Sequence, residues 1–444
     1  MTEKHAKEMK KFFAPILSTI IFVGCGGPPS TVPNQNISTP SNEKIKAEIP
    51  APTIKVYVEN SGSMDGYVRG TTDFENAVYS YLSNIQLSDL GRKSDSTSFK
   101  NILELNYINS QVLKQAPDVQ EFIRALEPNV FRMRGGNRGT SDMSDILNTI
   151  LKQNSSKHDI AIFVSDCIFS PGNQYRANDN ADEYLVSQQI GIKSHFVEQL
   201  SKNPEFSVVI LQLTSQFNGT YYNKFDERES IDDIRPYYIW LMGDREQVKK
   251  IMGKVDIAQI KGSGVKNIFM VSKSIKSMPY GILPPPQSIG KFRPDSSNPK
   301  TSIVKAEVDR KGGTSRFQLA IGVDFSKMLI PEEYLTNAAN YEVSNKAYNL
   351  EIVKNNTQGS SYTHIIRLNL VEPIISKGTV KITLKNSMPS WIEEYTDNEG
   401  LNIHANGAMK KTYGLKYLLG GVYDAYSSNK EEENNYGVIT VNIQ

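Results

Sequence analysis

The sequence predicts an α/β protein in which a doubly wound, mostly parallel sheet is followed by a β-sandwich-like domain. In residues 53–275, short apolar segments alternate with segments of helical periodicity, which is typical of a sheet covered by helices on both faces. In residues 301–444, apolar residues recur at every second position, as strands with one buried face require. Residues 276–300 are rich in proline and serine and are predicted to link the two domains.

The elements of the first domain follow from runs of apolar, often β-branched residues and from the helical segments between them. Within residues 216–236, the Asn218-Gly219 pair predicts a turn between two short aromatic segments, that is, an inserted hairpin. The expected strands are residues 53–59, 102–108, 159–165, 207–214, 237–242 and 267–271, and the expected helices are residues 72–84, 119–126, 143–152, 183–200 and 245–252.

The second domain is expected to consist mainly of strands. Residues 380–384 show the pattern most clearly, because valine, isoleucine and leucine alternate there with lysine and threonine. One helix is expected near the end, at residues 412–426. The other expected strands are residues 303–308, 317–323, 350–353, 365–371 and 438–443.

Residues 1–25 have the composition of an export signal. A lysine-rich start is followed by an apolar run, residues 12–23, that is too short to span a bilayer and that ends at Gly24-Cys25. This ending resembles the cleavage site of bacterial lipoproteins, and the resemblance implies that Cys25 becomes the lipid-carrying first residue of the mature chain. The alternative is an ordinary secretory signal with an incidental cysteine.

Residues 26–52 are predicted to form an extended tether, because prolines stand among polar residues there without hydrophobic periodicity. A tether between a lipid anchor and a folded domain places the protein in the cell envelope. No acidic run follows Cys25, which favours the periplasmic face over the cell surface. The nearly balanced charge, with 50 basic and 48 acidic residues, gives no electrostatic reason to expect nucleic-acid binding.

Oxygen-bearing side chains stand where the expected strands end and in the loops beside them. They are Glu59, Ser61, Ser63, Thr140 and Asp166. Because ligands bind at the carboxyl edge of open α/β sheets, these side chains are expected to lie close together. Hydroxyl and carboxylate oxygens are the ligands that a hard cation such as Mg²⁺ prefers. The sequence therefore predicts a cation site at this edge.

This arrangement resembles the metal-ion-dependent adhesion site (MIDAS) of von Willebrand factor type A (VWA) domains, whose pattern is Asp-x-Ser-x-Ser, a distant Thr and a distant Asp. Ser61 and Ser63 match the two serines, and Thr140 matches the threonine. Asp166 matches the second aspartate, whereas Glu59 stands where the family has aspartate. The resemblance implies a VWA-type, Rossmann-like fold and a bound Mg²⁺, Mn²⁺ or Ca²⁺. The hydroxyls would ligate it directly, and the acids would act largely through water.

By the same resemblance, the cation leaves a coordination position for an acidic residue of a partner protein. The expected function is thus protein recognition at a membrane surface, without catalysis. One alternative is a metal-assisted envelope hydrolase, although no general base is evident beside Ser61 and Asp166. The other is a structural subunit of an envelope complex with a vestigial metal site, in which the serines only cap a helix. A shallow face with an open coordination position would favour partner binding, and a deep pocket would favour the enzyme.

Overall fold

The structure is a computed structural model. It describes residues 53–91, 102–115, 118–139, 142–154, 156–171, 175, 180–273, 278–311, 314–427 and 435–444. The predicted signal and tether, with Cys25, lie outside the described residues, and so does Thr140.

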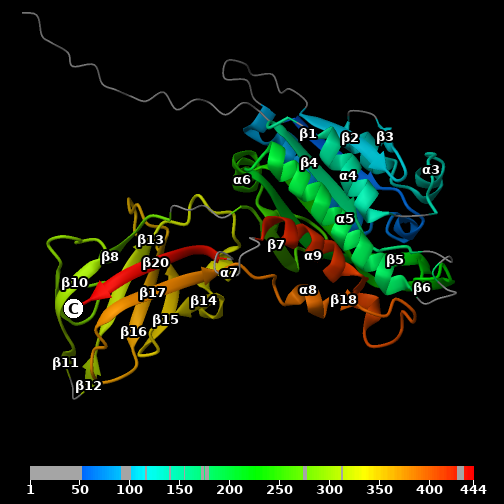
Figure 1. Ribbon diagram of the computed structural model, residues 1–444. Coiled ribbons are helices and arrows are strands. Elements are labelled where there is room, and N and C mark those ends of the chain that lie inside the picture. Colours follow the sequence, from blue (N-terminus) through cyan, green and yellow to red (C-terminus); the bar gives the residue numbers. More distant parts are fainter. Residues whose placement is uncertain are drawn as a thin grey trace, which may run out of the picture. The chain divides into compact units, whose positions relative to one another are not determined.

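A mixed sheet forms the centre of the first half of the chain (Figure 1). Its strands are β1 (Thr53–Glu59), β2 (Leu103–Ile108), β3 (Val112–Lys114), β4 (Asp159–Ser165), β5 (Phe206–Tyr222), β6 (Arg228–Asp244) and β7 (Asn267–Val271). Their order is β3-β2-β1-β4-β6-β5-β7. Only β1 pairs in parallel, with β2 and with β4, and the other neighbours are antiparallel. The sheet is therefore mixed, and the expected parallel pairing holds for the strands that carry the candidate site.

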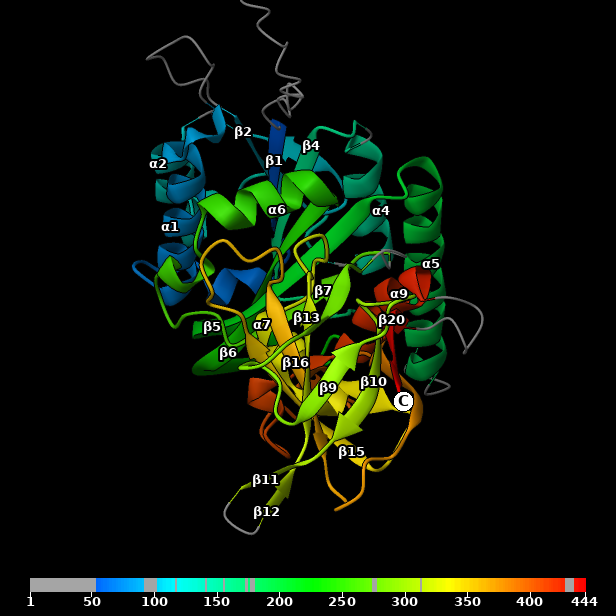
Figure 2. The same ribbon diagram turned by 90° about the vertical axis from the view of Figure 1, so that its left-hand side faces the viewer.

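Helices cover both faces of this sheet, as the alternation in the sequence predicts (Figure 2). One face packs against α1 (Asp73–Leu87), α2 (Val119–Arg124), α3 (Pro128–Arg132) and α6 (Arg245–Lys254), and the other against α4 (Met143–Gln153), α5 (Ala181–Lys202) and α9 (Leu415–Tyr426). Side chains of β1 alternate between the two cores: Val56 and Val58 enter the first, and Tyr57 enters the second.

The hairpin predicted in residues 216–236 exists, but its turn is not at Asn218-Gly219. Strand β5 continues through both residues, which pair with Asp232 and Ile231 of β6. The chain reverses further on, where the Asn223 amide donates to the Glu227 carbonyl over 3.0 Å. Because consecutive strands joined by so short a turn must be antiparallel, this hairpin also explains why the sheet is mixed.

The second half contains two sheets that share one hydrophobic cluster. The elements are β8 (Tyr280–Leu283), β9 (Lys291–Pro294), β10 (Ser302–Glu307), β11 (Asp309–Lys311), β12 (Thr314–Arg316), β13 (Gln318–Val323), α7 (Glu332–Thr336), β14 (Tyr341–Val343), β15 (Tyr348–Lys354), β16 (His364–Leu370), β17 (Gly378–Lys385) and β20 (Asn435–Ile443). One sheet has the order β14-β17-β20-β10-β9 and the other β15-β16-β13-β8, while β11 and β12 form a separate pair. The pairings are antiparallel except that of β10 with β20.

Residues 276–300, predicted to be a linker, contain strands β8 and β9. Gly281 of β8 pairs with Gly322 of β13, and the Tyr362 ring lies close to both glycines, which leaves no room for larger residues. The prolines do not interrupt the sheets, because they lie in the segments before and between the strands or, in the case of Pro294, at the end of the edge strand β9.

The expected helix at residues 412–426 is α9, and it packs against α5 of the first half. Gly421 permits this contact, since a Cβ there would lie 2.7 Å from the Gln189 carbonyl oxygen. The chain between β17 and α9 forms α8 (Trp391–Glu394), β18 (Thr396–Asp397) and β19 (Thr412–Tyr413). Among the described residues, no helix combines the length and the apolar character needed to cross a membrane.

Burial affects the carboxyl group of Glu75 in the first turn of α1. Its Oε1 atom is buried and has no hydrogen-bond partner among the described residues. Burial raises the pKa of Glu75 from 4.5 to about 7, and contacts with the backbone of Thr72 and Gly70 offset this only in part. The charged form of Glu75 is therefore disfavoured in the folded state.

We expect Glu75→Gln to stabilise the protein at about pH 8 and to have little effect near pH 4. Because the pKa of Glu75 is higher in the folded than in the unfolded state, its contribution to stability is present below about pH 4.5 and lost as the pH rises through about 7. Thermal unfolding of both proteins at the two pH values measures this. Equal melting temperatures at the higher pH would contradict the expectation.

Candidate metal site

Strands β1 and β4 bring the described members of the predicted site together. They are parallel neighbours with Val58 opposite Val164, so their carboxyl ends meet at one edge of the sheet. Glu59 is the last residue of β1, and Asp166 directly follows β4. Ser61 and Ser63 occupy the loop after β1, where residues Ser63–Gly66 form a short 3₁₀ turn.

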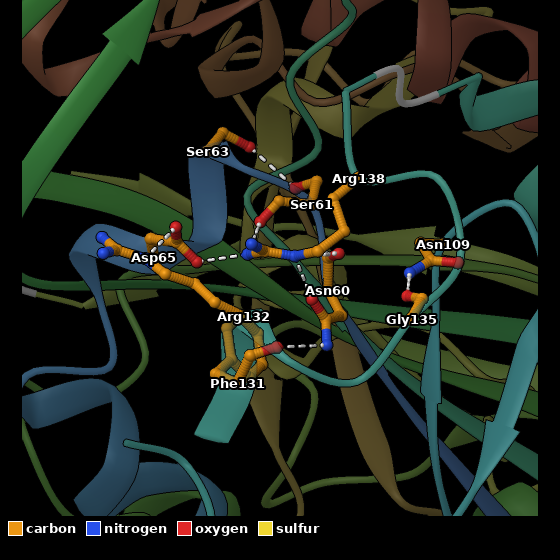
Figure 3. A network of polar contacts seen from close by, with 9 residues as sticks. All are labelled: Asn60, Ser61, Ser63, Asp65, Asn109, Phe131, Arg132, Gly135 and Arg138. Carbon is orange, nitrogen blue, oxygen red and sulfur yellow. Dashed lines mark hydrogen bonds and ion pairs between the residues drawn. The ribbon is translucent and has the colours of Figure 1, made fainter. Parts of the chain in front are cut away.

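The two serine hydroxyls point toward each other (Figure 3). Their Oγ atoms are 2.9 Å apart, and either can be the donor. Ser61 is buried, whereas Ser63 is half-buried and is the most accessible of the four predicted ligands that the structure describes. Two hydroxyl oxygens held this close can both reach one small cation.

Glu59 is fully buried and is fixed to the neighbouring strand. Its Oε2 atom accepts a hydrogen bond from the Ser165 hydroxyl. The same hydroxyl oxygen accepts a hydrogen bond from the Cys167 amide over 2.7 Å. Because Glu59 is already bound to β4, it is better placed to orient a water or a neighbouring ligand than to contact a cation itself.

Asp166 is the most informative member of the site. It is 1% exposed, and its Oδ1 atom accepts a hydrogen bond from the Ile168 amide over 3.3 Å. Its Oδ2 atom is buried and has no hydrogen-bond partner among the described residues. Burial raises the pKa of Asp166, and the Ser63 hydroxyl, the Ile168 amide and the charge of Arg235 offset this in part. A buried carboxylate oxygen without a donor fits a bound cation, because such a group otherwise costs folding free energy.

Arg138 ties the loop after β1 to the glycine-rich segment that ends before Thr140 (Figure 3). Its guanidinium donates to Asn60 Oδ1 over 2.6 Å, to the Ser61 carbonyl over 3.0 Å and to Asp65. In return, the Gly62 amide donates to the Arg138 carbonyl over 3.0 Å. Arg138 is not among the site residues predicted from the sequence, although its position two residues before Thr140 was an available signal.

The β5–β6 hairpin packs over the loop after β1 and covers the site. A Cβ at Gly66 would lie 2.4 Å from the Phe217 ring, and one at Gly219 would lie 2.6 Å from the Gly66 Cα atom. Near the hairpin tip, the Tyr222 hydroxyl would be 3.2 Å from a Cβ at Gly62. The site is thus more enclosed than an open, shallow face, and Ser63 is its accessible member.

Arg235 of β6 places a buried positive charge near Asp166. It is 2% exposed, donates to the Met409 carbonyl over 3.3 Å and lies over the Tyr221 ring. Its charge lowers the pKa of Asp166, against the larger effect of burial. The burial of Arg235 could not be predicted from the sequence, because Arg235 follows a mostly polar segment, residues 228–234.

Within the part of the chain that the structure describes, no group of three or more His, Cys, Asp or Glu residues could hold a metal ion. A cation here would therefore depend on the serine hydroxyls together with Asp166. Comparison of the chain with protein-family models, curated proteins and solved structures gave no match.

Proposed function

We propose that this protein recognises a partner protein in the cell envelope through a divalent cation bound at the carboxyl ends of β1 and β4. The observation that carries the proposal is the buried Oδ2 atom of Asp166, which has no donor among the described residues. Ser61, Ser63 and Asp166 would hold Mg²⁺, Mn²⁺ or Ca²⁺, with Thr140 as a further ligand and Glu59 acting through water. The resemblance to VWA domains supports the same assignment.

A bound cation would supply a positive charge, to which an acidic side chain of the partner could bind. Ser63 is the half-buried member of the ligand set, so the partner approaches beside Ser63, where the Tyr222 hydroxyl lies near Gly62. Lipid on Cys25 would hold the protein at the membrane, and residues 26–52 would give the domain reach.

The second candidate is a structural subunit of the envelope in which these residues bind no metal. The positive charges already at the site support it. Arg132 and Arg138 both pair with Asp65, and Arg235 acts on Asp166. In this role the arginines and the hydrogen-bonded loops would fix the edge of the sheet in place of a cation.

Calorimetric titration of the metal-free chain with magnesium or manganese separates the two candidates. Cation-dependent recognition predicts a saturable signal with a Kd of about 0.1–1 mM, as for extracellular cation modules. It also predicts that a chelator releases the partner. A flat titration with a sample that circular dichroism shows to be folded would leave the structural role.

A further inference from the structure

Strand β7 is an edge of the seven-stranded sheet, and one side of it has no neighbouring strand. The Lys266 amide donates to the Gln212 carbonyl of β5 over 2.8 Å. The Gln212 carbonyl therefore faces β7. Because Gln212 pairs with Asn267 and backbone groups alternate in an antiparallel ladder, Asn267, Phe269 and Val271 bond toward β5. Ile268 and Met270 therefore turn their amide and carbonyl groups toward the free edge.

This edge lacks the features that usually keep edge strands from pairing. Proteins protect such strands with charged residues, proline or a bulge. The sequence of β7 is Asn-Ile-Phe-Met-Val, and its register with β5 is regular from Asn267 to Val271. The opposite edge strand β3, in contrast, is three residues long and ends in Lys114. Strand β7 is thus open to pairing with another strand.

A groove of about 960 Å³ lies beside this edge. Apolar and aromatic side chains line much of it, including Val265 and Phe269 on the sheet side and Met388 and Trp391 opposite.

We propose that this groove binds an extended, largely uncharged peptide of a partner protein, which joins the sheet as a strand beside β7. The outward amide and carbonyl groups select a strand over a helix, because a strand presents matching groups at every second residue. The edge is about 17 Å long at 3.3 Å per residue, which suits a peptide of five to six residues. The apolar lining accommodates side chains on both faces of the added strand.

This peptide site is independent of the cation site. Strands β6 and β5 stand between β4 and β7 in the sheet. Peptide binding should therefore be unaffected by a chelator, whatever the outcome of the metal titration.

The test uses the full chain and a fluorescent, acetylated peptide, Lys-Thr-Val-Tyr-Val-Thr-Lys. The matched control is the same peptide N-methylated at its five central residues, which is more apolar but cannot donate backbone hydrogen bonds. Fluorescence anisotropy should show binding of the first peptide and at least about tenfold weaker binding of the second, since several backbone bonds are lost. Equal or tighter binding of the methylated peptide would overturn the proposal, because it would reveal mere apolar adsorption.

Ile268→Pro tests the same edge from the side of the protein. Proline is tolerated where an edge residue turns its amide away from the ladder, so the variant should keep its circular dichroism. We expect it to bind the unmethylated peptide more weakly than the wild type. No binding by the wild type up to the solubility limit of the peptide, or release of the peptide by a chelator, would also overturn the proposal.

Discussion

Asp166→Asn should weaken cation binding by more than about 100-fold and, in a chelator, should raise the melting temperature of the protein. The first effect is expected because even residues behind the ligands of a metal usually change affinity about 10–100-fold. The second follows from burial, which raises the pKa of Asp166 and makes its charge unfavourable without a cation. The contribution of this group is present below its unfolded pKa and lost as the pH rises, so asparagine removes a cost at neutral pH.

Saturating magnesium should reverse this order of stabilities. The wild type then gains the free energy of cation binding, which the variant lacks. Melting curves of both proteins in chelator and in magnesium measure the reversal. The matched control is Glu59→Gln, which keeps an oxygen for the Ser165 hydroxyl and should lose less affinity. If Glu59→Gln proves the more damaging change while Asp166→Asn binds normally, the roles assigned to the two acids are wrong.

Gly219→Ala should destabilise the protein by about 1–3 kcal/mol, the usual cost of overpacking. The added Cβ would lie 2.6 Å from the Cα and 3.0 Å from the amide nitrogen of Gly66. These are backbone atoms, so the hairpin and the loop must move apart. Because this contact covers the cation site, exchange of bound manganese should also become faster. Denaturant unfolding and metal-exchange kinetics measure the two effects.

Gly253→Ala is the control for that substitution. Gly253 lies in α6, and a Cβ there would meet no atom within 4 Å. Alanine is favoured over glycine in a helix by up to about 1 kcal/mol, so this variant should be as stable as the wild type or more stable. If both variants unfold at the same denaturant concentration, the hairpin does not depend on the contact between Gly66 and Gly219.

The parts of the fold that depend on local sequence were predictable. Strands β1 and β4 have the expected bounds, because each is an apolar, β-branched run that ends in polar residues. The first part of β6 was not predictable. Residues 228–236 are mostly polar and exposed, so they show no strand pattern. They are extended because they pair with β5 along its whole length, which is a tertiary effect.

The candidate site also has a part that could be predicted from the sequence and a part that could not. The closeness of Glu59 and Asp166 follows from two parallel strands that end together, and the sequence alone suggests it. The enclosure of the site cannot be predicted from the sequence, because it depends on the contact between Gly66 in the loop after β1 and Gly219 in the hairpin. A glycine in a strand looks like a turn signal until its neighbour in space is known, which is why Asn218-Gly219 was misinterpreted.

The path of residues 386–444 has a consequence for biosynthesis. The chain leaves the second half after β17, contributes α9 to the core around α5, and then returns to place β20 between β17 and β10. A growing polypeptide therefore cannot finish both cores until α9 and β20 have been made. Prematurely ended chains would expose the apolar face that α9 covers and lack an inner strand of the other sheet. Proteases would remove such fragments, so that only molecules that contain α9 and β20 accumulate.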